Sequence, residues 1–78
     1  MRSIDLHGLY IHDAWKKVAQ FLNLCYYEKI KTCEVICGQG LIKTEIEEWL
    51  RLNTYVREYR ISRTQGSYIV KLRKRKIQ

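Results

Sequence analysis

The sequence has no apolar run that approaches the ~18 residues needed to cross a membrane as a helix. Nor does it open like a secretory signal, because Asp5, His7, His12 and Asp13 interrupt the apolar residues near the N-terminus. It contains no low-complexity tract, and 46% of its residues are hydrophobic, which argues against a disordered chain. We therefore expect a folded, soluble protein of the cytoplasm with no membrane partner.

Cysteine is scarce and irregularly spaced. The three cysteines are odd in number and include no C-x-x-C pair, which is typical of a reducing compartment. A length of 78 residues allows one core but not two, and it leaves no interior for a cofactor of the size of a flavin. Any site must therefore be a cleft at the surface, and large multidomain machinery is excluded.

Acidic side chains are nearly missing from the last thirty residues, where nine basic side chains stand against Glu58 alone. The first 48 residues hold six basic and seven acidic side chains, a net charge of −1. All of the excess positive charge that gives the net charge of +7 therefore lies toward the C-terminus. This asymmetry predicts a polyanionic partner, with nucleic acid favoured over a membrane surface.

Apolar periodicity predicts six elements in the order strand, helix, strand, helix, strand, strand. Strand-like alternation occurs in four segments: residues 1–6, 32–37, 55–63 and 67–73. Helical spacing covers residues 11–28 and a second stretch from Ile42 to Leu50, which Asn53 ends. Right-handed crossovers would make the first three strands parallel and the last antiparallel to the third. We expect a two-layer α/β (α+β) sandwich of βαβαββ order, a four-stranded mixed sheet with two helices on one face.

One face of this sheet is predicted to be apolar and to meet the helices. It would carry Ile4, Leu6, Val35, Tyr59, Ile61, Tyr68, Val70 and Leu72. The opposite face would be open to solvent or a partner and would carry Asp5, His7, Glu34, Glu58, Arg60, Lys71 and Arg73. Five aromatic side chains also fit apolar stripes and are predicted core residues: Trp15, Phe21, Trp49, Tyr59 and Tyr68. Residues 1–73 would form the single domain, and residues 74–78 a basic tail.

Two strands end in sequences that suit chemistry at the carboxyl edge of a parallel sheet. The first ends in Asp5-Leu6-His7-Gly8, where a carboxylate could orient an imidazole. The second ends in Cys37-Gly38-Gln39-Gly40, where glycines let backbone N–H groups approach an anion at a helix N-terminus. Alone, each pattern is more often a polar surface pair or a plain strand-to-helix connection.

Together these segments resemble the Smr (small MutS-related) domain family. The segment from Ile4 to Gly8 is similar to the L-D-L-H-G signature that opens the family, and Gly38-Gln39-Gly40 stands where the family has H-G-x-G. The resemblance implies a stand-alone, single-domain member with the βαβαββ fold. It also implies DNA or RNA binding, with endonuclease activity in several members.

The sequence departs from the family pattern at the second motif. Cys37 replaces the family's second histidine, and Gln39 occupies the place of a residue that is often basic. A thiol is a poor proton donor near neutral pH, so we expect Cys37 to pack as a small hydrophobe. The departure leaves two functions open: an endonuclease, or a binding module without catalysis.

A cleavage mechanism can be written around His7 as general acid or base, with Asp5 orienting it. The amides of Gly38, Gln39 and Gly40 would stabilise the charged phosphorane. RNA is favoured over DNA because its 2′-OH is a nucleophile within the substrate, which a single histidine can activate as a general base. No cofactor is required, and a route assisted by Mg²⁺ or Mn²⁺ through Asp5 ranks second.

The remaining predicted nucleic-acid contacts fall into two groups. Near the site we expect Lys43, Arg60 and Arg63, with Tyr10 able to stack on an unpaired base. Away from it, the last strand and the tail would lengthen the footprint through Lys71, Arg73, Lys74, Arg75 and Lys76. A solubilising tail is the alternative for the second group.

Overall fold

The structure is a computed structural model and describes residues 1–38 and 41–74, without the side chains of Leu41 and Ile42. It contains the predicted elements in the predicted order: β1 (Arg2–Asp5), α1 (Ile11–Tyr27), β2 (Thr32–Ile36), α2 (Leu41–Leu52), β3 (Val56–Ile61) and β4 (Ser67–Leu72). In those residues no helix is both long and apolar enough to span a membrane.

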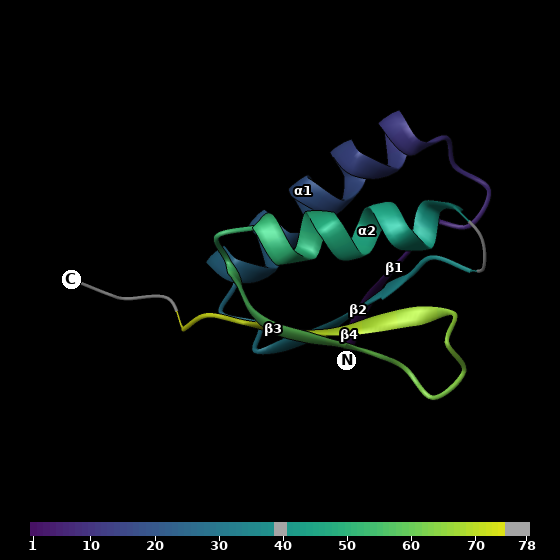
Figure 1. Cartoon of the computed structure of the whole chain (residues 1–78). Helices are drawn as coiled ribbons and strands as arrows, with labels where there is room; N and C mark the ends of the chain where they lie inside the picture. Colours follow the sequence, from purple (N-terminus) through teal and green to yellow (C-terminus); the bar gives the residue numbers. More distant parts are fainter. Residues whose placement is uncertain (39–40, 75–78) are drawn as a thin grey trace.

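The four strands form one mixed sheet in the order β1-β2-β4-β3. β1 pairs in parallel with β2, and β4 is antiparallel to both of its neighbours. The first three strands therefore run in one direction, as predicted, and β4 lies between the second and the third. Both helices cover the same face of this sheet (Figure 1). The predicted two-layer α+β fold is confirmed.

The core lies between the sheet and the helix layer. Val35 and Val70 from the sheet are fully buried, together with Leu6 just after β1, Leu22 of α1 and Ile46 of α2. All three cysteines are buried, free thiols. Ile61 differs from the prediction: it is 39% exposed, because it is the last residue of β3, which lies at the edge of the sheet.

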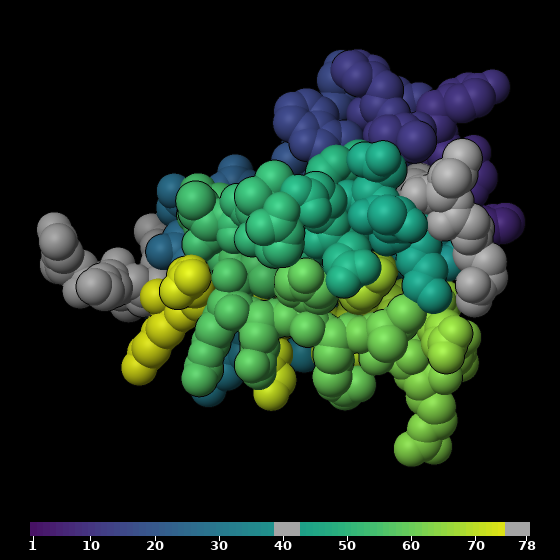
Figure 2. All heavy atoms as spheres, viewed as in Figure 1, coloured from purple at the N-terminus to yellow at the C-terminus, as the bar shows by residue number. Residues whose placement is uncertain are grey.

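The other face of the sheet carries no helix, and side chains of β3 and the following turn project from it (Figure 2). The cross-strand register places Ser3, Glu34 and Arg60 there in one row, with Ile69 between the last two. Ser67 donates a 2.7 Å hydrogen bond to the Glu34 carboxylate on this face. The sheet thus offers a polar surface, as its alternation predicted.

The C-terminal ends of both helices are held together by aromatic rings. Tyr26 of α1 stacks on Tyr55, which follows α2, with ring centroids 4.3 Å apart. The side-chain oxygen of Asn53 accepts a 2.8 Å hydrogen bond from the Tyr55 N–H. Asn53 therefore ends α2, as predicted, and sets the path of the chain into β3.

Candidate functional site

His7 lies in a tight turn that begins where β1 ends, at Asp5. A carboxylate oxygen of Asp5 accepts a 2.9 Å hydrogen bond from the His7 backbone N–H. The buried Leu6 between them donates its N–H to Ile36 at 2.8 Å and so ties the turn to β2. The expectation that Asp5 and His7 both lie on a strand is wrong. Asp5 bonds to the main chain of His7, and the His7 side chain is exposed at the end of the sheet.

Gly38 brings the second motif against His7. A Cβ atom at Gly38 would lie 3.2 Å from Cδ2 of the His7 ring, and Gly38 has a φ of +70°. Glycine is therefore required here for its backbone conformation and for the close approach of the imidazole. The two motifs, 31 positions apart in the sequence, do meet in the fold.

The β3–β4 turn closes the same end of the sheet. The carbonyl oxygen of Gly66 accepts hydrogen bonds from the backbone N–H groups of Cys37 and Gly38, each at 2.9 Å. The connections β1–α1, β2–α2 and β3–β4 consequently gather at one end of the molecule, which we call the loop end (Figure 1). The Gly38 N–H already donates to this carbonyl oxygen, and phosphate binding by Gly38 stays a prediction.

Cys37 is a packing residue. It is 2% exposed, and its Sγ donates a 3.6 Å hydrogen bond to the Gly66 carbonyl oxygen. Burial raises the pKa of the Cys37 thiol, and the nearby Lys43 ammonium partly opposes this rise. The thiol therefore stays protonated near neutral pH, which fits the expected packing role. The same electrostatic contact places Lys43 close to the loop end.

The basic side chains expected near the site divide between two surfaces. Arg60 lies on the open face of the sheet, opposite Ile69. Arg63 is exposed in the β3–β4 turn, at the loop end. The placement of this turn beside His7 is as predicted, because Gly66 within it contacts Cys37 and Gly38.

Two aromatic residues at the N-cap and in the first turns of α1 are exposed. Tyr10, a predicted stacking residue, is 83% exposed. Trp15 is 50% exposed, so its assignment to the core is wrong. The buried face of α1 is instead Ala14, Val18, Leu22 and Cys25, which leaves Trp15 one position outside it. Sequence spacing gave no signal for this choice, because Ile11 and Trp15 have the same four-residue spacing as Ala14 and Val18.

The basic residues of β4 and its extension lie at the other end of the sheet, as predicted. Lys71 forms an ion pair with Glu58 at 3.2 Å. Arg73 donates from Nε to the Thr54 carbonyl oxygen at 3.1 Å, and Lys74 is exposed. Four predicted contacts lie outside the described residues: Gln39, Gly40, Arg75 and Lys76. Within residues 1–38 and 41–74, no three His, Cys, Asp or Glu side chains come together as a metal site would require.

Known proteins share this fold and sequence. The Smr domain of MutS2 from Thermus thermophilus superposes with a TM-score of 0.89 at 25% identity, covering 94% of this chain and 99% of that one. YdaL, a stand-alone small MutS-related protein from Escherichia coli, superposes with a TM-score of 0.86 at 20% identity, covering 92% of this chain and 64% of that one.

The sequence comparisons define the relationship. The ribosome rescue factor SmrB from Buchnera aphidicola subsp. Baizongia pistaciae is 33% identical over 66 residues. That alignment covers 81% of this chain, which spans only 38% of the length of SmrB. Residues 4–73 match the Smr domain family, and the chain therefore belongs to it.

Proposed function

We propose that this chain binds nucleic acid at its loop end and cleaves the phosphodiester backbone there, with RNA favoured over DNA. The observation that carries the proposal is the contact between the His7 ring and Gly38, which joins both motifs on an exposed surface. His7 would take the proton of the 2′-OH as it attacks phosphorus, or give a proton to the leaving 5′-oxygen.

The charged phosphorane needs stabilisation from donors other than Gly38, whose N–H is engaged with Gly66. Lys43 and Arg63 would supply this positive charge, since Lys43 lies in the first turn of α2 and Arg63 in the β3–β4 turn. Tyr10, exposed beside the turn of His7, would stack on an unpaired base. SmrB is named as a ribosome rescue factor, and we propose ribosome-bound RNA in the cytoplasm as the substrate.

The test compares cleavage of labelled RNA and DNA by the wild type, His7→Ala and His12→Ala, each with and without Mg²⁺ or Mn²⁺. His12 is an exposed histidine on the first turn of α1 and provides the matched control. We expect His7→Ala to lower the cleavage rate at least about 100-fold and His12→Ala to lower it little. Equal rates for wild type and His7→Ala would refute the catalytic role of His7.

A binding module without cleavage is the second candidate, and one observation favours it. Cys37 is buried where the family has its second histidine, so one proton carrier of the pattern is replaced by a protonated thiol. Retained binding by the wild type with no cleavage in any metal condition would select this candidate.

A further inference from the structure

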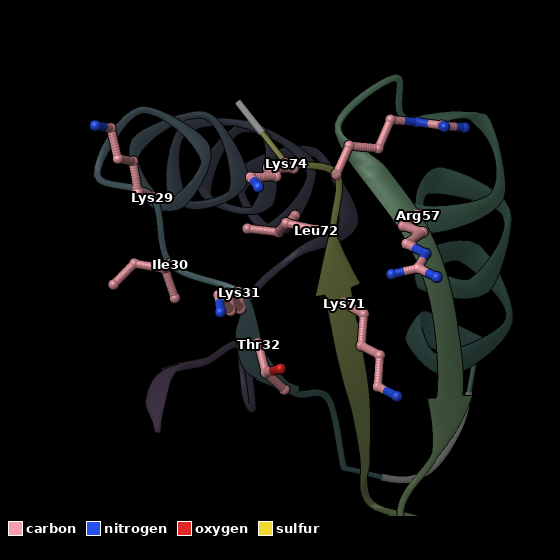
Figure 3. A pocket seen from close by; sticks show the side chains of 9 residues that line it. Lys29, Ile30, Lys31, Thr32, Arg57, Lys71, Leu72 and Lys74 are labelled. Carbon is pink, nitrogen blue, oxygen red and sulfur yellow. The ribbon is translucent and has the colours of Figure 1, made fainter. Parts of the chain in front are cut away.

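A hollow of about 610 Å³ lies at the end of the sheet opposite His7. It is bordered by the α1–β2 connection, the start of β3 and the end of β4 (Figure 3). Among the nine described residues that line it, none is acidic and six are basic: Lys29, Lys31, Arg57, Lys71, Arg73 and Lys74. Three of the six, Lys29, Lys31 and Arg57, come from outside the β4 segment and its extension.

The hollow has an apolar floor with charged walls. Figure 3 shows Leu72 near its middle, with Lys31 and Lys74 on one side and the Arg57 guanidinium on the other. Leu72 is 6% exposed and belongs to the core, so the floor is rigid. Cations held around a fixed floor can meet several negative charges of one ligand at once.

Lys29 reaches this surface from an unusual backbone position. It has a φ of +62°, at the residue that follows the C-cap of α1. The N–H of Ile30 bonds to Cys25 at 2.9 Å and the N–H of Lys29 bonds to Tyr26 at 3.1 Å, which together form a Schellman ending. Glycine is the usual residue here, because a side chain is strained at positive φ. A lysine at a strained position suggests that its charge is useful.

Arg57 is presented by a second irregularity. The pairing of β3 with β4 shifts between Val56 and Glu58, which leaves Arg57 as an additional residue opposite Lys71. Such a bulge turns a side chain away from the regular alternation. Arg57 lines the hollow, whereas Glu58 lines a different hollow on the open face.

The local carboxylates do not neutralise this set. Glu58 pairs with Lys71, and Glu28, near Lys29 in sequence, pairs with Arg2. Among the ion pairs of the described residues, Lys71 is the one cation of the hollow that takes part. The surface therefore favours a ligand with several negative charges.

A row of cations connects this hollow to the loop end. Lys71 also lines a hollow of about 140 Å³ on the open face, which Arg60 lines too. Arg63 follows in the β3–β4 turn. β4 has six residues, so the two ends lie about 20 Å apart at ~3.3 Å per residue. Successive phosphates of one B-DNA strand are spaced ~3.4 Å along the axis, and on this scale the distance corresponds to about six nucleotides of one strand.

We propose that the hollow is a second phosphate-binding site, which holds the backbone of the nucleic acid whose scissile bond lies at His7. The inference rests on the proposed function and adds to it a defined footprint: a substrate must extend about six nucleotides beyond the site to fill both ends.

The test measures binding by fluorescence anisotropy for Lys31→Gln/Arg57→Gln and for the control Lys16→Gln/Lys17→Gln. The control removes the same charge from exposed positions on α1. The ligands are single-stranded RNAs of about 16 and about 4 nucleotides. We expect Lys31→Gln/Arg57→Gln, the hollow variant, to bind the long strand about tenfold more weakly than the control does, with a salt slope lower by about 1.4. Both variants should bind the short strand equally.

Three results would overturn the inference and leave the proposed function standing. The first is an equal loss of RNA affinity in the two variants. The second is an equal loss of affinity for the long and the short ligand. The third is unchanged RNA binding by the hollow variant together with weaker binding to phosphatidylserine vesicles. Absence of any RNA binding by the wild type would overturn both proposals. If the double variant fails to fold, Lys74→Gln against Lys16→Gln repeats the comparison with one charge.

Discussion

Gly38 combines two constraints that can be separated by mutation. Gly38 and Gly8 both have positive φ, at +70° and +82°, but a Cβ at Gly8 would have nothing within 4 Å. We expect Gly38→Ala and Gly8→Ala each to lower the free energy of unfolding by about 1 kcal/mol, from backbone strain. Gly38→Ala should in addition displace the His7 ring and lower cleavage about tenfold.

Thermal unfolding and cleavage rates of these two variants decide the point. If Gly8→Ala lowers cleavage as much as Gly38→Ala, strain alone explains the loss, and the His7–Gly38 contact has no separate role.

Cys37 provides a second prediction for a single residue. Because burial raises the pKa of its thiol, Cys37 should neither donate nor accept a proton in the reaction. Cys37→Ala is expected to lower the free energy of unfolding by about 1 kcal/mol through lost packing. It should leave the pH profile of cleavage unchanged. If the pH dependence of the cleavage rate loses its acidic or its basic side in this variant, Cys37 does transfer a proton in the reaction.

The end of α1 makes a prediction about an element. Lys29→Gly removes the strain at φ +62°, and Lys29→Ala retains it while removing the same charge. We expect Lys29→Gly to raise the free energy of unfolding by about 0.5 to 1 kcal/mol, since the relief of strain exceeds the entropy cost of glycine. Lys29→Ala should show no such gain. Urea unfolding measures both, and a gain in both variants would mean that charge repulsion, not strain, is relieved.

The helices and strands were more predictable from the sequence than the register of α1 and the residue at which β1 ends. All six follow from periodicity, because each must bury one face in a single core. The register of α1 was harder to predict: Ile11 and Trp15 have the same four-residue spacing as Ala14 and Val18, and only the packed sheet distinguishes them. The role of Asp5 depended on where β1 stops, which alternation does not determine.

At the scale of the whole molecule, the split of charge along the sequence predicted a polyanionic partner but not where the cations would gather. The hollow unites Lys29 and Lys31 with four cations of the basic C-terminal part. That assembly depends on a strained helix end and a strand irregularity, for which the sequence offers no glycine or proline as a signal. The approach of Gly38 to His7 was predictable because both motifs follow strand ends, which a parallel sheet brings to one edge.

Buried acids in the core make the stability of the whole molecule depend on pH, and the pKa shifts of Cys33 and Tyr68 are large. Burial raises the pKa of the Cys33 thiol from 9.0 to about 12, and burial, assisted by nearby Glu47, raises that of Tyr68 from 10.0 to about 12. The folded chain therefore retains these protons more tightly than the unfolded chain. Their contribution to stability is complete below pH 9 and is lost as the pH rises toward 12.

Urea unfolding in a pH series above pH 9 should show a fall in the free energy of unfolding of up to about 1.4 kcal/mol per pH unit for each group. Cys33→Ala and Tyr68→Phe each remove one titrating proton and should make the decline shallower, although both start from lower or altered stability. The slope, not the absolute stability, is therefore the quantity to compare. A decline of equal steepness in the wild type and both variants would show that other groups, such as the exposed lysines losing their charge, control stability at high pH.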